Sequence, residues 1–165
     1  MKDVILTIEE NVHLTENVLR MKLSGDLSHI SAPGQFVNIK IDGLYLRRPI
    51  SVCDTDGKTL TIIYKVVGKG TEKMWQMKAG DTLKVLVGLG NGYDTALSGS
   101  APLLLGGGVG VPPLYMLAKK LISEGKKVSC VLGFNTKDEV FYENEFKKLG
   151  CDVSVTTVDG SYGIK

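Results

Sequence analysis

Several features that would mark a membrane, secreted or metal-binding protein are scarce in this chain. Only three of its 165 residues are cysteine, and Cys53, Cys130 and Cys151 stand apart in apolar surroundings. This usage predicts buried, reduced thiols and argues against a disulfide framework or an iron–sulfur centre within these residues. No segment approaches the ~18–20 apolar residues of a membrane span, and the first residues lack the pattern of a secretory signal. We therefore expect a cytoplasmic protein with no membrane partner.

Two further scarcities narrow the function. The net charge is only +2, which is too weak to indicate a nucleic-acid partner. The two histidines, His13 and His29, lie in polar segments, and neither a Ser–His–Asp arrangement nor a pair of carboxylates is visible. We therefore expect no catalytic side chain and no metal site. The apolar content of 43% and the charged content of 23% are typical of a soluble globular protein.

The first 98 residues carry the pattern of β-strands. In the segment 18–23, for example, three apolar residues alternate with Arg20 and Lys22. Turn-forming glycine, proline and aspartate residues separate such segments. Six short antiparallel strands favour a closed Greek-key β-barrel, because closure removes the exposed edges. We predict this barrel as a domain over residues 1–98, with strands at 4–9, 18–23, 36–41, 50–53, 59–67 and 82–87.

A short helix is expected to interrupt the strands of this first part. Gly68, Gly70 and Thr71 form a glycine-rich turn just before the segment 72–78. Thr71 is expected to cap the helix, because a threonine hydroxyl accepts hydrogen bonds from the free amides of a first turn. Trp75, on the same helix, is expected to plug the barrel.

The pattern changes beyond residue 98. Apolar runs at 102–105, 128–134 and 151–158 alternate with segments of helical periodicity at 114–122 and 139–149. The order strand–helix–strand–helix–strand predicts a parallel sheet. Three parallel strands make half of a doubly wound sheet. We therefore predict that 99–165 is the N-terminal half of a Rossmann-like α/β domain whose C-terminal part is missing.

Three segments have the chemistry to hold phosphate groups. The glycine-rich run 106–110 follows a strand and precedes a helix that opens with Pro112, a geometry that places a dinucleotide on a helix N-terminus. Arg48 and Ser51 offer a planar guanidinium group and a hydroxyl. The turn 68–71 offers backbone amides at the start of the short helix. Each segment also has an interpretation without a ligand. The run 106–110 could be only a tight turn, Arg48 could be only a solvated side chain, and the turn 68–71 could be only a helix cap.

Taken together and in this order, these segments resemble the ferredoxin-reductase-like flavoproteins. The chain is most similar to one family among them, the electron-transfer subunits of the NAD-linked, two-subunit bacterial dihydroorotate dehydrogenases. The resemblance covers essentially the whole chain, and Arg-Arg-Pro-Ile-Ser with Gly-Lys-Gly-Thr is its narrower signature. It is carried by Pro-Gly-Gln-Phe-Val at 33–37, Arg-Arg-Pro-Ile-Ser-Val at 47–52, Ile-Tyr-Lys-Val at 63–66, Gly-Lys-Gly-Thr at 68–71, Gly-Leu-Gly-Asn-Gly at 88–92, and the segments 106–114 and 159–165.

The resemblance implies an FAD site in the barrel and an NAD site in the α/β part. The residues so assigned are Arg48 for the FAD phosphate; Pro49, Ile50 and Ser51 for the isoalloxazine ring; Ile63, Tyr64 and Lys65 for the ribityl and adenosine side; Gly70 and Thr71 for the diphosphate; and Gly107, Gly108, Val109, Gly110 and Pro112 for the turn that binds NAD.

The resemblance also implies partners and a longer chain. Members of this family continue beyond the matched region and carry cysteines there for a [2Fe–2S] centre, which exchanges electrons with an FMN-containing catalytic subunit. The intact protein would be a heterotetramer that carries electrons from dihydroorotate to NAD in pyrimidine biosynthesis. The chain as it stands would be incomplete for turnover. Because the strand 102–105 would then lie at a sheet edge, we expect self-association or low stability.

Two other functions stay open at this point. The chain could be the reductase module of another NAD(P)H oxidoreductase, acting on ferredoxin or a polysulfide, or a truncated docking module without a cofactor. The choice between NAD and NADP also stays open. Asn135, Thr136 and Lys137 follow the second strand of the α/β part, and they include neither a clear acid for the ribose nor an arginine for a 2′-phosphate.

Overall fold

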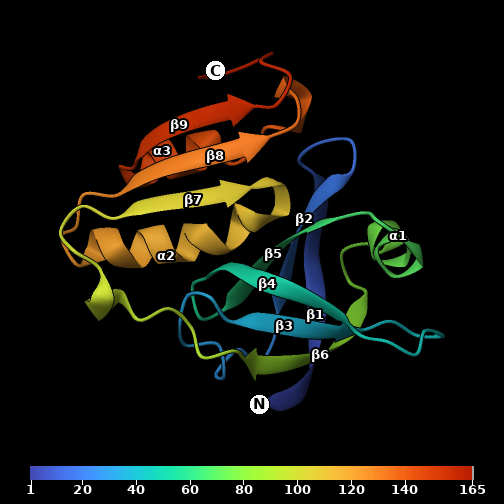
Figure 1. Cartoon of the computed structure of the whole chain (residues 1–165). Coiled ribbons are helices and arrows are strands. Elements are labelled where there is room, and N and C mark those ends of the chain that lie inside the picture. The colour runs from blue at the N-terminus through green and yellow to red at the C-terminus, as the bar shows by residue number, and fades with distance from the viewer. Residues whose placement is uncertain (165) are drawn as a thin grey trace.

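The computed structural model describes residues 1–164 and has two parts, a closed β-barrel and a parallel sheet with two helices (Figure 1). The barrel order is β1-β2-β5-β4-β3-β6, and every pair of neighbours is antiparallel. The predicted six-stranded Greek-key barrel is therefore confirmed. Its strands are β1 (Lys2–His13), β2 (Val18–Ser24), β3 (Phe36–Lys40), β4 (Arg48–Thr55), β5 (Thr59–Lys65) and β6 (Thr82–Leu89).

The alternation read in the sequence decides which side chains enter the barrel. On β2, Leu19, Met21 and Leu23 are at most 1% exposed and lie in the barrel core. The intervening Arg20 points outward, and its Nη2 lies 2.7 Å from Glu10 Oε1 on the neighbouring strand β1. Strand β2 is thus fixed by its apolar face, because a one-residue slip in register would expose all three core side chains.

Helix α1 (Lys69–Gln76) closes one end of the barrel. Met74 is fully buried in the barrel core, and Asn11 Nδ2 of β1 donates to the carbonyl oxygens of Met74 and Met77 at 2.9 and 3.0 Å. The prediction that Trp75 plugs the barrel is wrong. Its side chain is half exposed and donates from Nε1 to His13 Nε2 at 2.9 Å. The helix presents position 74 to the core, so its neighbour along the chain faces out.

The predicted cap of this helix is also wrong. The N-cap residue is Gly68, and the helix begins two residues before Thr71. Thr71 instead occupies the third helical position, where its Oγ1 accepts from the amides of Val67 at 2.9 Å and Gly68 at 3.3 Å. The threonine hydroxyl still satisfies free amides at the helix start, but it reaches backward to them rather than forward.

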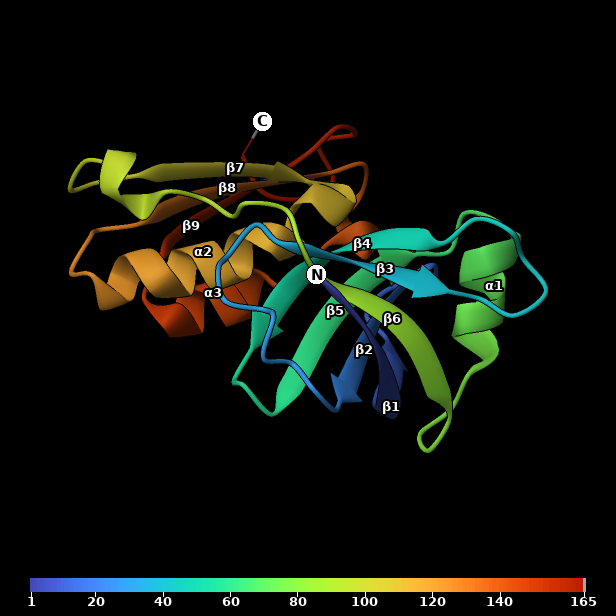
Figure 2. The same cartoon turned by 90° about the horizontal axis from the view of Figure 1, so that it is seen from below.

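The second part is a three-stranded parallel sheet in the order β7-β8-β9, as predicted. Helices α2 and α3 lie on the same face of this sheet, between it and the barrel (Figure 2). The elements in chain order are η1 (Thr95–Leu97), β7 (Leu103–Gly107), η2 (Gly108–Gly110), α2 (Pro112–Ser123), β8 (Ser129–Phe134), η3 (Lys137–Glu139), α3 (Glu143–Leu149) and β9 (Asp152–Thr157).

The helix expected over 139–149 is shorter than predicted. Its first residues form the end of η3 and an extended segment, and α3 begins only at Glu143. The interruption falls at Tyr142, whose φ of 65° lies in the left-handed region that ends helical geometry. Phe141 and Tyr142 are both buried by this turn. Gly150 ends the helix with a φ of 94°, as its position in the sequence predicts.

The two parts share an apolar core. Val18, Cys53 and Ile63 from the barrel lie in one cluster with α2 and α3 residues such as Leu117 and Phe146. All three cysteines are free and buried, which confirms the sequence interpretation, and burial raises the pKa of the Cys53 thiol to about 12. The domain boundary expected at 98–99 falls between η1 and β7 and stays a prediction, because this core joins both parts.

In the described part of the chain, the parallel sheet keeps an unpaired edge at β7. There, β7 pairs with β8 alone, and its Leu103 and Leu105 are 58% and 66% exposed on the face away from the helices. The other edge strand, β9, is partly covered, because Thr156 pairs with Gly163 and the Ile164 amide donates to Val155 O at 2.8 Å. The expected edge at β7 is therefore present.

Within residues 1–164, no helix is long and apolar enough to cross a membrane.

Candidate functional site

A cavity of about 380 Å³ lies where the barrel meets the sheet. We call it the barrel pocket. Residues 48–51 at the start of β4 and 63–65 at the end of β5 line it, together with Val67, Thr71 and Val109. Strands β4 and β5 are neighbours in the barrel, and this pairing brings together two segments that lie more than ten residues apart in the sequence. The pocket thus gathers the whole predicted FAD set except Gly70.

Gly70 is nevertheless part of this site through Arg48. A Cβ atom at Gly70 would lie 2.5 Å from Cζ and 2.7 Å from Nη2 of Arg48, so the guanidinium group occupies the space beside the glycine. Arg48 Nη1 also donates to the carbonyl of Leu46. The first amides of a helix have no carbonyl partner within it, and the positive end of the helix dipole adds to the arginine charge. Arg48 and the start of α1 therefore form a cradle suited to a phosphate group.

Among the other residues predicted to contact FAD, some side chains are buried in the protein core and others are exposed to the pocket. Tyr64 is 1% exposed, and its hydroxyl donates to Asn11 Oδ1 at 3.0 Å inside the barrel, where burial raises its pKa to about 12. Ile63 is buried in the core shared with α2. These two residues can therefore face a ligand only through the backbone of β5. Lys65 and Ser51 keep partly exposed side chains at the pocket.

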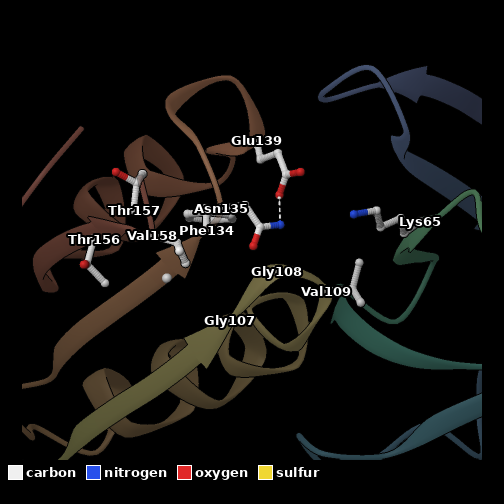
Figure 3. A pocket seen from close by; sticks show the side chains of 11 residues that line it. Lys65, Gly107, Gly108, Val109, Phe134, Asn135, Glu139, Thr156, Thr157 and Val158 are labelled. Atoms are coloured by element: carbon white, nitrogen blue, oxygen red, sulfur yellow. Dashed lines mark hydrogen bonds between the residues drawn. The ribbon is translucent and has the colours of Figure 1, made fainter. Parts of the chain in front are cut away.

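A second cavity, of about 520 Å³, lies at the carboxyl ends of the three parallel strands (Figure 3). We call it the sheet-end pocket. Its walls are residues 107–109 at the end of β7 and just beyond it, residues 133–135 at the end of β8, Glu139 of η3, residues 156–158 at the end of β9, and Lys65 on the barrel side. In parallel α/β sheets, ligands bind at the carboxyl ends of the strands. The cavity therefore lies where the topology predicts a dinucleotide site.

The predicted NAD residues are only partly on its wall. Gly107, Gly108 and Val109 line the pocket, whereas Gly110 and Pro112 do not. Gly110 lies at the end of η2, and Pro112 is the first residue of α2, where a missing amide costs no helical hydrogen bond. These two residues shape the turn and start the helix.

Two glycines of this turn have a clear geometric role. Gly108 has a φ of 51°, a conformation that other residues adopt only under strain. A Cβ atom at Gly106 would lie 2.7 Å from Leu114 Cδ1 and 3.1 Å from both Val111 Cα and Gly110 O. Gly106 therefore allows α2 to pack closely on β7, and this contact places the start of α2 next to the pocket.

The residues that sequence reasoning missed lie at the ends of β8 and β9 and in the segments that follow them. Gly133, Phe134, Glu139 and the segment 156–158 line the sheet-end pocket without any glycine-rich or charged motif to mark them. The available signal was topological, because residues that follow successive parallel strands meet at one edge of the sheet. Asn135, which follows β8 and bears on the choice between NAD and NADP, lies on the pocket wall (Figure 3).

The two pockets adjoin. Lys65 and Val109 line both, so the end of β5 and the turn after β7 form their common boundary. Val109 is 45% exposed at this boundary. Two ligands held in the two cavities would therefore meet at these residues.

This fold and pair of pockets define a class, the FAD- and pyridine-nucleotide-binding reductases of the ferredoxin-reductase type. An NADH-dependent reduced ferredoxin-NADP oxidoreductase structure superposes with a TM-score of 0.87 at 36% identity, covering 98% of this chain and 59% of that one. A flavohemoglobin from Malassezia yamatoensis, solved with bound FAD and heme, has a TM-score of 0.85 at 18% identity, covering 99% of this chain and 47% of that one, and shows a common fold. No protein-family model matches the chain.

Curated relatives narrow the class to one family. The chain is 49% identical to the dihydroorotate dehydrogenase B (NAD(+)) electron transfer subunit of Fusobacterium nucleatum, over 100% of this chain and 66% of that protein. It is 44% identical to the subunit of the same name from a Geobacillus species, over 100% of this chain and 67% of that protein. The chain belongs to this family of electron transfer subunits and spans about two thirds of the length of these relatives.

Proposed function

We propose that the chain binds FAD in the barrel pocket and NAD in the sheet-end pocket, and that it passes electrons between them as part of a dihydroorotate dehydrogenase B. The observation that carries this proposal is the common boundary of the two pockets at Lys65 and Val109. When bound, NAD and FAD supply hydride transfer, and the flavin can also pass electrons one at a time. The chain supplies the placement that lets the two reactive rings meet.

On the FAD side, the chain provides charge and a close backbone approach. Arg48 and the first turn of α1, with Gly70 and Thr71, would hold the diphosphate, since the guanidinium group lies directly beside Gly70. Pro49, Ile50 and Ser51 would lie along the isoalloxazine ring, and the ribityl and adenosine side would follow Lys65 and the backbone of Ile63 and Tyr64.

On the NAD side, the chain provides a glycine-rich turn whose backbone a ligand can approach closely. Gly107 and Gly108 would approach the diphosphate, and Gly110 and Pro112 would set the start of α2 behind it. Val109 would lie beside the nicotinamide, at the boundary where the two pockets adjoin. Among residues 1–164, Lys65 is the one acid or base that lines both pockets, so binding and orientation are the contribution of this part of the chain.

The names of the relatives support a partner for the whole protein. We infer that the intact protein pairs with an FMN-containing catalytic subunit in a heterotetramer and that a [2Fe–2S] centre, held outside the 165 residues of this chain, links the two flavins. Electrons would then run from dihydroorotate to NAD, a step of pyrimidine biosynthesis.

Titration with FAD tests the first half of this proposal. The purified chain should take up one equivalent of FAD, followed by flavin absorbance and fluorescence quenching. Gly70→Ala should weaken binding about 100-fold, because the new methyl group displaces Arg48 from the helix start. Gly99→Ala is the matched control, since nothing lies within 4 Å of a Cβ atom there. A chain that takes up no FAD, or equal affinity in both variants, would contradict the assignment.

A second candidate function follows from the 36% identical ferredoxin-NADP oxidoreductase structure. Both functions use the same two pockets, so the electron acceptor separates them. After anaerobic reduction of the intact, longer protein by NADH, reoxidation by added ferredoxin would favour the second function. Reoxidation only by the catalytic subunit of a dihydroorotate dehydrogenase B would favour the first.

A further inference from the structure

The end of strand β1 turns polar side chains toward the inside of the barrel. Ile8 is buried in the barrel core, but the pairing of β1 with β2 shifts by one residue between Ile8 and Glu10. Because successive residues of a strand point to opposite faces, this bulge turns the odd-numbered residues inward beyond it. Asn11 accordingly lies opposite Met21, which is fully buried in the core.

Asn11 uses both ends of its side-chain amide. Its Nδ2 donates to the carbonyl oxygens of Met74 and Met77 at 2.9 and 3.0 Å, and its Oδ1 accepts from the hydroxyl of Tyr64 at 3.0 Å. Since carbonyl oxygens only accept, these partners determine which end of the amide faces helix α1. The last carbonyls of a helix have no amide partner within it, and Asn11 supplies a donor from a distant strand. The C-terminal end of α1 is therefore bound to β1 and, through Tyr64, to β5.

Other contacts of α1 constrain its direction less. Met74 packs into the barrel core through apolar contacts, which have no preferred direction. Trp75 Nε1 donates to His13 Nε2 at 2.9 Å, but this bond lies at the exposed surface. The bonds from Asn11 to Met74 and Met77 are partly buried, and hydrogen bonds depend strongly on angle. Asn11 is therefore well placed to set the direction of the helix.

The opposite end of this helix belongs to the cradle formed by Arg48, Gly70 and Thr71. Helix α1 has eight residues, so its two ends lie about 12 Å apart at ~1.5 Å per residue. A helix this short is not stable alone, and its direction depends on the groups that hold it. A tilt at its C-terminal end moves the amides of its first turn relative to Arg48, whose guanidinium group occupies the space beside Gly70.

We propose that Asn11 is a positioning residue for FAD. It holds the C-terminal end of α1 so that the first turn of the helix and Arg48 face the same diphosphate, and it does so without touching the ligand. This inference rests on the proposed function, since it needs the FAD diphosphate to lie at the start of α1.

A double-mutant cycle on FAD affinity tests this proposal with the 165-residue chain. Asn11→Leu removes the hydrogen bonds and adds no charge. We expect FAD to bind at least about tenfold more weakly, because misplaced donors lose charge-assisted contacts to the diphosphate. In the Gly70→Ala background the cradle is already disrupted, so the same substitution should weaken FAD binding by less than about threefold. A residue that only stabilises the barrel would give the same loss in both backgrounds.

Two further variants sharpen the cycle. Glu10→Gln is the matched control, because Glu10 precedes Asn11 on β1 but faces outward, with its Oε1 2.7 Å from Arg20 Nη2. It should leave FAD affinity within about twofold. Tyr64→Phe keeps the donors of Asn11 but removes the bond that orients them, and it should weaken FAD binding about threefold. This milder variant replaces Asn11→Leu in the cycle if circular dichroism shows that Asn11→Leu does not fold.

The outcomes separate this inference from the proposed function. If the wild type binds FAD and Asn11→Leu binds it equally well, Asn11 has no positioning role while the FAD site stands. The same conclusion follows if Asn11→Leu, or Tyr64→Phe in its place, weakens binding equally with and without Gly70→Ala. If the wild type takes up no FAD, the proposed function is wrong, and the role of Asn11 is overturned with it.

Discussion

The barrel and the parallel sheet differ in whether their strands are paired on both sides. Each of the six barrel strands has two hydrogen-bonded neighbours, so no edge is left. The parallel sheet has β7 at an open edge, and Leu103 and Leu105 are exposed on the face that the helices leave bare. A closed antiparallel sheet satisfies its backbone alone, whereas a parallel sheet depends on covering elements on both faces. The two pockets adjoin because the open sheet packs α2 against the closed barrel.

The barrel should be destabilised most by a substitution at Met74. This side chain is fully buried at the barrel end, so Met74→Ala should lower the free energy of unfolding by about 2–5 kcal/mol, measured by urea denaturation. Met77→Ala is the matched control, because Met77 is only partly buried and should cost less. Equal losses in the two variants would show that α1 does not seal the barrel through Met74.

The sheet side depends on the contact between β7 and α2. Gly106→Ala places a methyl group 3.1 Å from backbone atoms of Val111 and Gly110, and these cannot move without shifting the helix. We expect a loss of about 1–3 kcal/mol in unfolding free energy. Gly110→Ala meets nothing within 4 Å and should have a smaller effect. A Gly106→Ala variant as stable as the wild type in thermal denaturation would refute the close packing.

The core shared by the two parts should show in the pH dependence of stability. Burial raises the pKa of Cys53 from 9.0 to about 12, so between these values the unfolded chain has lost a proton that the folded chain keeps. Stability from this thiol is complete below pH 9 and falls as pH rises, by at most about 1.4 kcal/mol per pH unit. Cys53→Ala should make the unfolding free energy fall less steeply between pH 9 and 11 than in the wild type. An unchanged slope would contradict the prediction.

The smallest expected effect concerns the open edge. We predict that the chain associates through β7, because an unpaired apolar edge can pair with another chain. Leu105→Lys should shift light scattering toward monomer while changing the unfolding free energy by less than about 0.5 kcal/mol. Ile5→Lys, an equally exposed aliphatic residue on the barrel, should leave association unchanged. A wild-type chain that stays monomeric at high concentration would remove the contrast between the two sheets.

The misjudged elements share a physical cause. Thr71 has the side chain of a helix cap, and Trp75 has one large enough to fill the barrel end. Because α1 begins at Lys69, Thr71 lies at the third helical position and Trp75 lies on the outer face. The helical pattern at 139–149 was cut short because Tyr142 turns into the left-handed region and is buried in the shared core. In each case a longer-range packing requirement overrode a local preference.

By itself, the sequence determined the strand alternation, the glycine turns and the order of elements, because these depend on neighbours a few residues apart. It therefore predicted the barrel, the half sheet and most of the residues around the barrel pocket. Only the tertiary structure decided that Tyr64 turns its ring into the barrel, that Lys65 and Val109 form one boundary, and that Glu139 reaches the sheet-end pocket. These are outcomes of register and packing between distant segments, and a linear pattern carries no direct signal for them.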